Sequence, residues 1–382
     1  MLRPQYLDAV RSELSATYPL PQWPLHWSKF ALTRSEQDFL LHETKFRDKW
    51  PTMMDAGFAP PPSANAEQAS SEATATWKAA EFGPRNGGRV LDLTGGSGVD
   101  SWAFEARGAQ VTCCETDPYL AELLRWNGQS RHRAVHEGPA ETFDGGHFDL
   151  VYADPSRRSV HGERLDWSDL GTPDPRLHLK TWLTWAPTVL LKLSPMVDRN
   201  AVARIFPTAD LVVYLSRRRE VKELLVRIPR GTPISPTKVL AVDVDAFGTE
   251  HYRLAAEATA VDVAPEIGAF LHDPDPVLRA AGAEEAWAQQ AGLQRAAPKM
   301  HLFTSQHGSS LPGGRHFAVE SVHHSLPKDL GSASIVAKGF PERPEVLRKR
   351  WRLAESSERF LFALQSGNPG RKTFVVARRL TD

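Results

Sequence analysis

The sequence predicts an α/β fold built on a seven-stranded, mostly parallel sheet, with a helical amino-terminal region and a small α+β carboxyl-terminal region. A short apolar strand at residues 89–93 runs into a glycine loop, and apolar strands then alternate with helical patterns as far as residue 229. The last two predicted strands are separated only by residues 217–222. Parallel neighbours need a crossover of about a dozen or more residues, usually a helix, so the seventh strand should run antiparallel.

The first 64 residues are predicted to form a helical domain and a linker. Aromatic and leucine side chains recur at helical spacing within residues 6–14 and 30–40. The segment 59–66 contains three consecutive prolines and therefore breaks the helix. A helical pattern resumes over residues 70–80, just before the first strand.

Short apolar segments define the strands of the predicted sheet domain, residues 65–231. Because ligands bind at the carboxyl ends of the strands in a doubly wound sheet, the residues that follow each strand are the candidates for a site. The predicted strands are 89–93, 110–115, 132–136, 148–154, 188–194, 210–216 and 223–229, with a short helix at 198–206.

Two smaller domains are predicted after the sheet. Residues 232–331 contain strand patterns at 238–254 and 300–322, on either side of a helical stretch at 276–293. Residues 332–382 contain a basic helix at 344–352, followed by strands near 359–364 and 373–377.

The glycine loop is the strongest indication of a ligand. It reads Asp92-Leu93-Thr94-Gly95-Gly96-Ser97-Gly98-Val99-Asp100, and its glycines allow a sharp turn and a close approach of the backbone to a ligand. The next strand ends in Glu115, at about the twenty-residue distance at which Rossmann-like folds place an acid for ribose hydroxyls. The alternative for Glu115 is a solvated acid at a strand end.

The residues around this loop favour a cationic ligand. Ser101 stands where a dinucleotide fingerprint needs its third glycine. Asp92 and Asp100 flank the loop, and two carboxylates would repel a pyrophosphate. S-adenosylmethionine, with its ammonium and sulfonium charges, fits better than NAD, so a nucleotide-dependent oxidoreductase is the least favoured class.

The fourth strand ends in a second candidate site, Asp154-Pro155-Ser156-Arg157-Arg158. The Asp154 carboxylate and the Pro155 carbonyl are two acceptors that can hold an amine with its lone pair facing a methyl group. Most of the acceleration would then come from orientation. The alternative for Asp154 is a cap on the following turn. Arg157 and Arg158 can grip a phosphate or can pair with nearby acids.

The charge of the chain is zero overall but is unevenly distributed. Residues 299–382 hold 14 Lys and Arg against 7 Asp and Glu, a net charge of +7, which leaves −7 for residues 1–298. A basic carboxyl-terminal part favours a nucleic-acid partner. The alternative is a solvated basic helix.

Composition also predicts which kinds of site are absent. The two cysteines, Cys113 and Cys114, are adjacent on a strand, face opposite sides of the sheet and are poor candidates for a disulfide or a catalytic thiol. The 14 histidines show no metal-binding spacing, so no metal is expected. No apolar stretch is long enough to cross a bilayer and no signal peptide is evident, so we expect a cytoplasmic protein without membrane contact.

Four segments together resemble the bacterial class I S-adenosylmethionine-dependent methyltransferases that carry a THUMP-like carboxyl-terminal domain. They are residues 67–79, 92–100, 154–158 and 191–195. Seven strands with a reversed last hairpin are also the layout of that class. The resemblance implies a methyltransferase domain at 65–231, a ferredoxin-like domain at 232–331 and a THUMP-like domain at 332–382. It also implies an RNA substrate, because THUMP domains accompany RNA-modifying enzymes.

The resemblance and the residue patterns together predict three groups of site residues. The catalytic pair is Asp154 and Pro155. Cofactor binding is assigned to Asp92, Thr94, Gly95, Gly96, Gly98, Asp100, Glu115, Asp117 and Ala140. Substrate binding is assigned to Tyr152, Arg157, Arg158 and Lys192.

Three departures from the family pattern bear on these roles. Pro139 stands where the superfamily commonly has an acid for the adenine amine, so adenine recognition falls to the Ala140 backbone or to Glu141. Ser156 and Arg157 replace the second proline and aromatic residue of many nucleobase N-methyltransferases, so stacking on a flipped base falls to Tyr152, Trp167 or the amino-terminal region. Residues 337–339 replace a more polar Arg-Asn pair of the THUMP-like domain.

The leading hypothesis is a methyltransferase that uses S-adenosylmethionine and modifies RNA at a base nitrogen. Carbon-5 methylation of pyrimidines generally needs a thiolate, and neither cysteine lies near the end of the fourth or sixth strand. One alternative is an RNA-binding protein whose methyltransferase domain is not catalytic. Another is a methyltransferase that acts on a protein or a small molecule.

Overall fold

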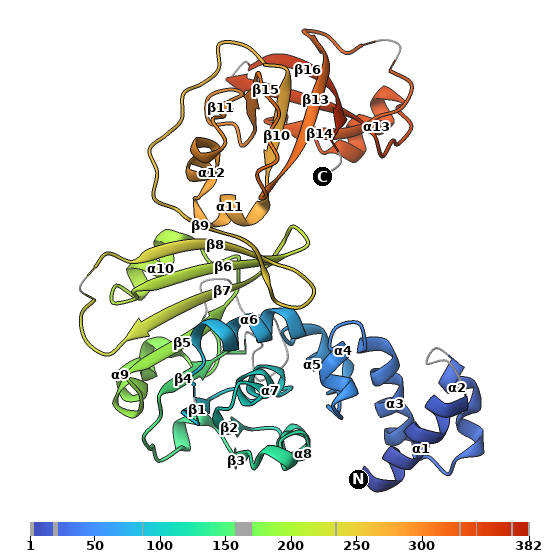
Figure 1. The fold of residues 1–382 in the computed structure, drawn as a ribbon, viewed down its shortest axis with the longest axis vertical. Coiled ribbons are helices and arrows are strands. Elements are labelled where there is room, and N and C mark those ends of the chain that lie inside the picture. Colours follow the sequence, from blue (N-terminus) through green and yellow to red (C-terminus); the bar gives the residue numbers. More distant parts are fainter. Residues whose placement is uncertain are drawn as a thin grey trace.

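The computed structural model describes residues 4–17, 22–85, 87–156, 170–233, 235–327, 330–340, 342–367 and 370–380. Two β-sheets follow one another along the long axis of the molecule, with helices around them (Figure 1). The amino-terminal helices lie beside the first sheet, and the carboxyl-terminal residues form the second.

All seven predicted strands form and belong to the first sheet. Strand β7 is antiparallel to both β5 and β6, which confirms the prediction made from the short connection before it. That connection is the two-residue turn of Arg218 and Arg219, both at positive φ, as hairpin turns of this length require. The seven strands are β1 (Arg89–Asp92), β2 (Gln110–Glu115), β3 (Ala134–Glu137), β4 (Leu150–Ala153), β5 (Thr188–Leu193), β6 (Leu211–Arg217) and β7 (Glu220–Pro229).

Two further strands extend this sheet to nine, in the order β3-β2-β1-β4-β5-β7-β6-β8-β9. Strand β8 (Lys238–Val244) runs parallel to β6, and β9 (Glu250–Ala255) runs antiparallel to β8. The domain boundary predicted at residue 231 does not match this topology. Pairing with β6 buries the apolar residues of β8, and nothing local in the sequence indicates which sheet a strand joins.

Helices cover both faces of the first sheet. Alternate residues of each strand point to opposite faces, so Val90 and Leu190 pack with α6 (Glu72–Phe82) and α7 (Val99–Ala106). Leu91 and Leu191 instead pack with α9 (Pro175–Trp185) and α10 (Arg199–Ile205), the helix predicted at 198–206. Helix α8 (Pro118–Asn127) lies beside β2 and β3.

The amino-terminal helices are packed onto the first sheet's own helices. Trp50 and Phe58 share a buried cluster with Trp102 of α7, and Leu40 shares another with Leu120 of α8. The second of these clusters consists mainly of residues from the region predicted at 1–64, and Leu120 and Leu123 of α8 complete it, so this region is joined to the first sheet's helices through a shared core. Its helices are α1 (Pro4–Thr17), α2 (Trp23–His26), α3 (Arg34–Phe46), α4 (Pro51–Asp55) and α5 (Ser63–Gln68).

The second sheet has seven strands in the order β11-β12-β10-β13-β16-β15-β14. The two domains predicted at 232–331 and 332–382 share it, because β13 pairs with both β10 and β16 and so joins the two parts. Its elements are β10 (Phe270–Pro274), β11 (Gln294–Arg295), β12 (Phe303–Ser305), β13 (Gly314–His323), β14 (Ser334–Lys338), β15 (Arg359–Gly367) and β16 (Gly370–Arg379), with helices α11 (Pro276–Ala281), α12 (Glu284–Gln290) and α13 (Pro344–Trp351).

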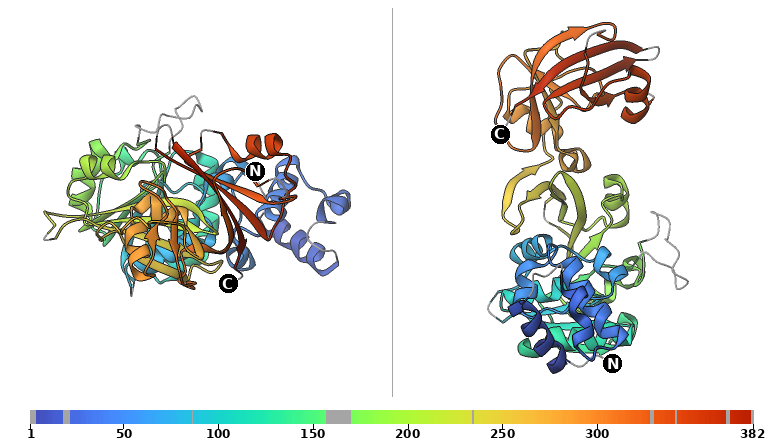
Figure 2. Two further views of the ribbon diagram at one scale, coloured as in Figure 1. Left: turned by 90° about the horizontal axis from the view of Figure 1, so that it is seen from above. Right: turned by 90° about the vertical axis from the view of Figure 1, so that its right-hand side faces the viewer.

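Helix α11 joins the two sheets. It lies between them in both side views (Figures 1 and 2) and contacts β6, β7 and β8. Val277 and Leu278 share a buried cluster with Val212, so the junction is apolar. Arg219 adds ion pairs to Asp273 and Asp275 across it. In the part of the chain described here, no helix is long and apolar enough to cross a membrane.

Candidate active site

A cavity of about 980 Å³ opens at the carboxyl ends of β1, β2, β4 and β5. Parallel strands bring their following residues to one edge of the sheet, which is why segments far apart in the sequence meet there. Of the predicted site residues, the cavity is lined by Asp92, Thr94, Gly95, Gly96, Asp100, Glu115, Asp117, Ala140, Tyr152, Asp154, Pro155 and Lys192.

Of the predicted site residues that the structure describes, Gly98 is the one outside the lining. Gly98 adopts φ +76°, and a Cβ there would lie 2.7 Å from Leu124 Cδ2, so packing behind the loop requires this glycine. Packing thus accounts for the glycine at position 98, and its contact with a cofactor stays a prediction. Arg157 and Arg158 lie outside the described residues, and so does Trp167.

Asp92 is held at the base of the glycine loop. Its carboxylate is buried and accepts hydrogen bonds from Ser101 Oγ at 2.6 Å and from the Thr94 amide at 3.0 Å. Burial raises the pKa of Asp92 to about 6, although these two hydrogen bonds oppose the rise. This carboxyl can therefore change its charge within a few units of neutral pH.

Gly96 and Glu115 bring the loop and the end of β2 together. Gly96 adopts φ +50°, and an added Cβ would have only the Thr94 carbonyl oxygen, at 3.5 Å, within 4 Å. Its amide donates to Glu115 Oε2 at 2.7 Å, and the amide of Asp117 donates to Glu115 Oε1 at 2.8 Å. Asp117 itself caps α8 by accepting from the Tyr119 amide. The loop thus presents open backbone beside a carboxylate.

Asp154 lies across the cavity from this carboxylate and is tied to the glycine loop. Its backbone amide donates to Thr94 Oγ1 at 2.7 Å, and its carboxylate forms an ion pair with Lys192 of β5. Burial would lower the pKa of Lys192, but Asp154 and Glu223 outweigh it and raise that pKa. Lys192 therefore stays charged and holds the Asp154 carboxylate in place.

Tyr152 does not offer a ring face for stacking. The residue is 1% exposed, its ring packs edge-on against Phe104, and its hydroxyl donates to Asp100 Oδ2 at 2.8 Å. The sheet and helix α7 enclose the ring, so of the three alternatives for stacking on a base this arrangement favours Trp167 or the amino-terminal region over Tyr152.

Several lining residues were not predicted. Asn65, Gln68 and Ser70 bring the amino-terminal region into the wall of the cavity, and Lys222 reaches it from β7. The segment 67–79 carries part of the family resemblance, which is the one signal in the sequence that could have indicated Gln68 and Ser70. The order β5-β7-β6 places Lys222 here, and no local pattern indicates it.

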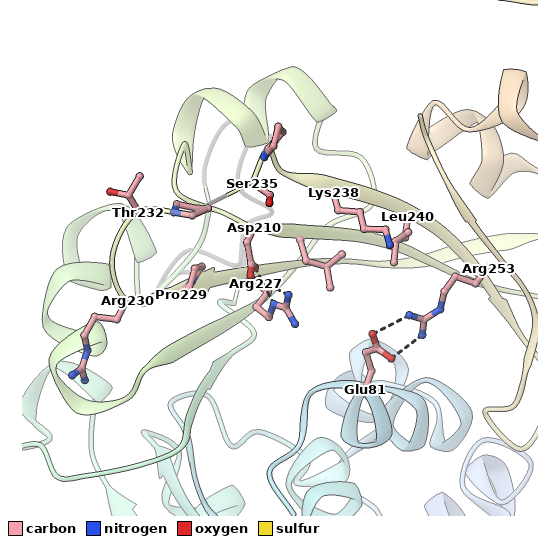
Figure 3. A pocket seen from close by; sticks show the side chains of 13 residues that line it. Glu81, Asp210, Arg227, Pro229, Arg230, Thr232, Ser235, Lys238, Leu240 and Arg253 are labelled. Carbon is pink, nitrogen blue, oxygen red and sulfur yellow. Dashed lines mark hydrogen bonds and ion pairs between the residues drawn. The ribbon is translucent and has the colours of Figure 1, made fainter. Parts of the chain in front are cut away.

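A second hollow of about 610 Å³ lies at the amino ends of β6 and β8 (Figure 3). Arg227 is paired with Asp210, and Arg253 donates to both carboxylate oxygens of Glu81. These arginines are held by neighbouring acids, and no glycine loop faces the hollow. It is therefore not the candidate active site.

Cysteine and metal chemistry find little support in the described part of the chain. Cys113 and Cys114 are buried and unpaired, and burial raises the pKa of Cys114 to about 12 and that of Cys113 further. Neither supplies a thiolate at neutral pH. Among the described residues, no group of three His, Cys, Asp or Glu side chains could hold a metal ion.

No curated protein matches the sequence, but a family model and solved structures do. Residues 314–379 match the family model described as THUMP domain-like, which begins at β13 and not at the predicted residue 332.

Solved structures give the wider comparison. The crystal structure of a proposed methyltransferase from Porphyromonas gingivalis W83 is 24% identical, covers 100% of both chains and gives a TM-score of 0.80. A proposed RNA methyltransferase from Pyrococcus horikoshii is 20% identical over 45% of this chain and 87% of its own, with a TM-score of 0.32. The full-length match confirms the predicted fold class. The chain thus has the fold of the Porphyromonas gingivalis protein over its full length, and its carboxyl-terminal residues 314–379 match the THUMP domain-like family model.

Proposed function

We propose that this protein uses S-adenosylmethionine to methylate RNA at a base nitrogen. The observation that carries the proposal is the convergence in one cavity of an open glycine loop, the carboxylate of Glu115 and the Asp154–Pro155 pair. The THUMP-like domain on the same chain supports RNA as the class of substrate.

The residues of the loop fit the proposed cofactor, which when bound supplies a methyl group on a cationic sulfur. Asp92 offers negative charge at the base of the loop, and Gly96 leaves room for close backbone contact. Glu115, at the end of β2, would bind the ribose hydroxyls. Ala140 and Glu141 line the cavity, where they would contact the adenine.

Asp154 and Pro155 would orient the acceptor. The carboxylate and the carbonyl can accept hydrogen bonds from an N–H group, so that the nitrogen lone pair faces the methyl group. As the nitrogen forms its bond to the methyl carbon, the bond between that carbon and sulfur would break and leave a neutral thioether. The nitrogen would then lose a proton, and the Asp154 carboxylate is the adjacent base. Burial raises the pKa of the Asp154 carboxyl, which makes it a better proton acceptor, and the Lys192 ammonium opposes that rise and favours the charged form.

The carboxyl-terminal region would supply the contact with RNA. Lys349 and Arg352 in and after α13, and Arg378 and Arg379 at the end of β16, are exposed. Residues 299–382 carry a net charge of +7, which suits a polyphosphate backbone.

The test is transfer of tritium from labelled S-adenosylmethionine to total RNA from cells that lack the protein, followed by mass spectrometry of the nucleosides. Asp154→Asn should lower the rate by about a hundredfold or more, since it removes the acceptor's orienting charge. Asp149→Asn is the matched control, because Asp149 precedes the same strand at its opposite end and accepts from the Arg89 amide. Label in protein or in small molecules, or no label at all, would contradict the proposal.

Cofactor binding is tested separately by calorimetry. Asp92→Ala and Gly96→Val should each abolish binding of S-adenosylmethionine, because one removes the loop's charge and the other fills its open side. Unaltered affinity in both variants would show that the cofactor lies elsewhere.

A further inference from the structure

A buried charge network lies directly behind the wall of the cavity. Lys78 of α6 has a fully buried side chain, and its Nζ lies 2.8 Å from Asp100 Oδ1 and 2.7 Å from Glu223 Oε2. The same ammonium donates to Ser70 Oγ at 2.7 Å. Lys78 and Glu223 do not line the cavity, so the proposed chemistry makes no direct use of them.

Asp100 connects this cation to the cavity wall. Its Oδ2 accepts from the Tyr152 hydroxyl at 2.8 Å and from Ser70 Oγ at 2.9 Å. Burial alone would raise the pKa of Asp100, but Lys78 and Lys192 outweigh it and keep that pKa below its ordinary value. Asp100 is therefore a charged group that already has a cation and two hydroxyl donors. The sequence predicts that Asp100 binds the cofactor's ammonium directly. To do so, Asp100 would have to lose a contact with Lys78, Tyr152 or Ser70.

The network joins elements that carry the two halves of the site. Asp100 is the second residue of α7, immediately after the glycine loop, whereas Tyr152 is two residues before Asp154 on β4. Ser70 lies between α5 and α6, and Glu223 lies on β7. Five separate segments are thus held to one another by a single group of charges.

If the network served stability alone, apolar side chains would stabilise the fold as well without the desolvation cost. Burying a lysine with two carboxylates has a large desolvation cost, and well-packed hydrophobic residues are often as stabilising. The directional contacts of the network instead fix where the loop and the strand end lie relative to each other. Methyl transfer depends on this spacing, because a misplacement of about 1 Å between reacting groups can cost a hundredfold in rate.

We infer that Lys78, Asp100, Ser70 and Tyr152 form a positioning network that sets the spacing between the glycine loop and Asp154. This inference rests on the proposed methyltransferase function. Lys78 does not line the cavity, and the polar atoms of Ser70, Asp100 and Tyr152 in its wall are bonded to one another. Their removal should therefore slow the transfer step and leave the binding of cofactor and RNA nearly unchanged.

Single-oxygen deletions test this inference with little disturbance of the fold. Tyr152→Phe and Ser70→Ala each remove one donor to Asp100. Ser216→Ala is the matched control, since Ser216 is also buried and donates to a buried carboxylate, Asp243 Oδ1 at 2.5 Å, away from the cavity. All variants are made in the full chain, and each is measured for melting temperature, affinity for S-adenosylmethionine and initial rate of tritium transfer to RNA.

Each network variant should slow transfer at saturating cofactor and RNA by about tenfold or more, with the cofactor Kd and the KM for RNA within about threefold of the wild type. Ser216→Ala should match the wild type in rate. Network variants no slower than Ser216→Ala would overturn the inference. A loss confined to cofactor affinity would also overturn it, and would make these residues direct ligands. A wild-type chain that transfers no label would overturn both the proposed function and this inference.

Discussion

At the scale of single residues, the glycines of one loop have different neighbours. Around Gly96 an added Cβ would meet nothing closer than 3.5 Å, whereas around Gly98 it would lie 2.7 Å from Leu124 Cδ2 and 3.0 Å from Arg133 Nη1. Both residues have positive φ, so any side chain is strained at either place. The open space beside Gly96 suits contact with a ligand, whereas the close neighbours of Gly98 indicate a role in packing.

Alanine substitutions should separate these roles. Gly96→Ala should weaken binding of S-adenosylmethionine more than tenfold while costing about 1–2 kcal/mol of unfolding free energy, the ordinary cost of positive φ for a side chain. Gly98→Ala should lose about 1–3 kcal/mol more, because its Cβ must displace Leu124 or Arg133. Calorimetry and urea unfolding measure the two quantities. Weaker cofactor binding in Gly98→Ala than in Gly96→Ala would contradict this division.

The raised pKa of Asp92 makes a prediction about pH. With a pKa near 6, Asp92 is mostly protonated and neutral at pH 5 and mostly charged at pH 7. Its attraction for a cationic cofactor should therefore appear as pH rises through about 6, and affinity for S-adenosylmethionine should increase by up to about tenfold per pH unit below that value and then level off. Calorimetry between pH 5 and 7.5 measures the curve. Asp92→Asn should bind weakly and show no such step, and a step that survives this substitution would assign it to another group.

At the scale of elements, the amino-terminal helices are bound to the first sheet by specific contacts. The backbone of Ala59 exchanges two hydrogen bonds with the side chain of Asn127 at the end of α8: the Ala59 amide donates to Oδ1 at 2.7 Å, and Nδ2 donates to the Ala59 carbonyl at 2.9 Å. Both residues are buried. This contact fixes the chain just before the prolines that lead to the cavity wall at Asn65 and Gln68.

Loss of that contact should be costly. Asn127→Ala would leave the buried amide and carbonyl of Ala59 without partners, at about 1–3 kcal/mol for each unsatisfied group. We expect unfolding free energy to fall by about 2–4 kcal/mol, measured by urea denaturation. Asn200→Ala, at an exposed position of α10, is the control and should change stability little. Equal stabilities of the two variants would show that Ala59 finds other partners.

The elements also show how far sequence patterns lead. Strand ends, glycines and the short hairpin at Arg218 are local signals, and they predict β1 to β7 and the reversed last strand. Most of the predicted site residues line the cavity, but they make up only about a third of its lining. Strand β8 pairs with β6 because the edge of β6 is free to pair in the folded chain. The sequence 238–244 has the pattern of a strand but contains no signal for the sheet that it joins. Lys78 of α6 likewise forms an ion pair with Glu223 of β7 only in the folded chain, and no spacing along the sequence predicts that pair.

At the scale of the whole molecule, the cavity and the basic region lie in different parts of the chain. The cavity lies in the first sheet, while the net charge of +7 lies in residues 299–382, which contribute to the second. Helix α11 and the ion pairs of Arg219 fix one sheet against the other. Under the proposed function, an RNA bound by the basic region would be presented to a site in the other sheet of the same chain, which suits a polymer better than a small molecule.

Charge reversal on the second sheet's helix should therefore weaken RNA binding without affecting the cofactor. Lys349 and Arg352 are exposed in and after α13, so the double variant Lys349→Glu/Arg352→Glu should lose phosphate contacts but keep its fold. We expect affinity for RNA to fall by about five- to tenfold or more near physiological salt, and the slope of log K against log salt to become shallower by about 1–2, because each phosphate contact contributes about 0.7–0.9 to it.

Filter binding at several salt concentrations measures both the affinity and the slope. The control, Arg107→Glu/Arg204→Glu, reverses two exposed charges beside the first sheet, one directly after α7 and one on α10, and should leave both quantities unchanged. Equal losses in the two double variants would mean that only total charge matters, and no loss in the first would place the RNA contact outside α13.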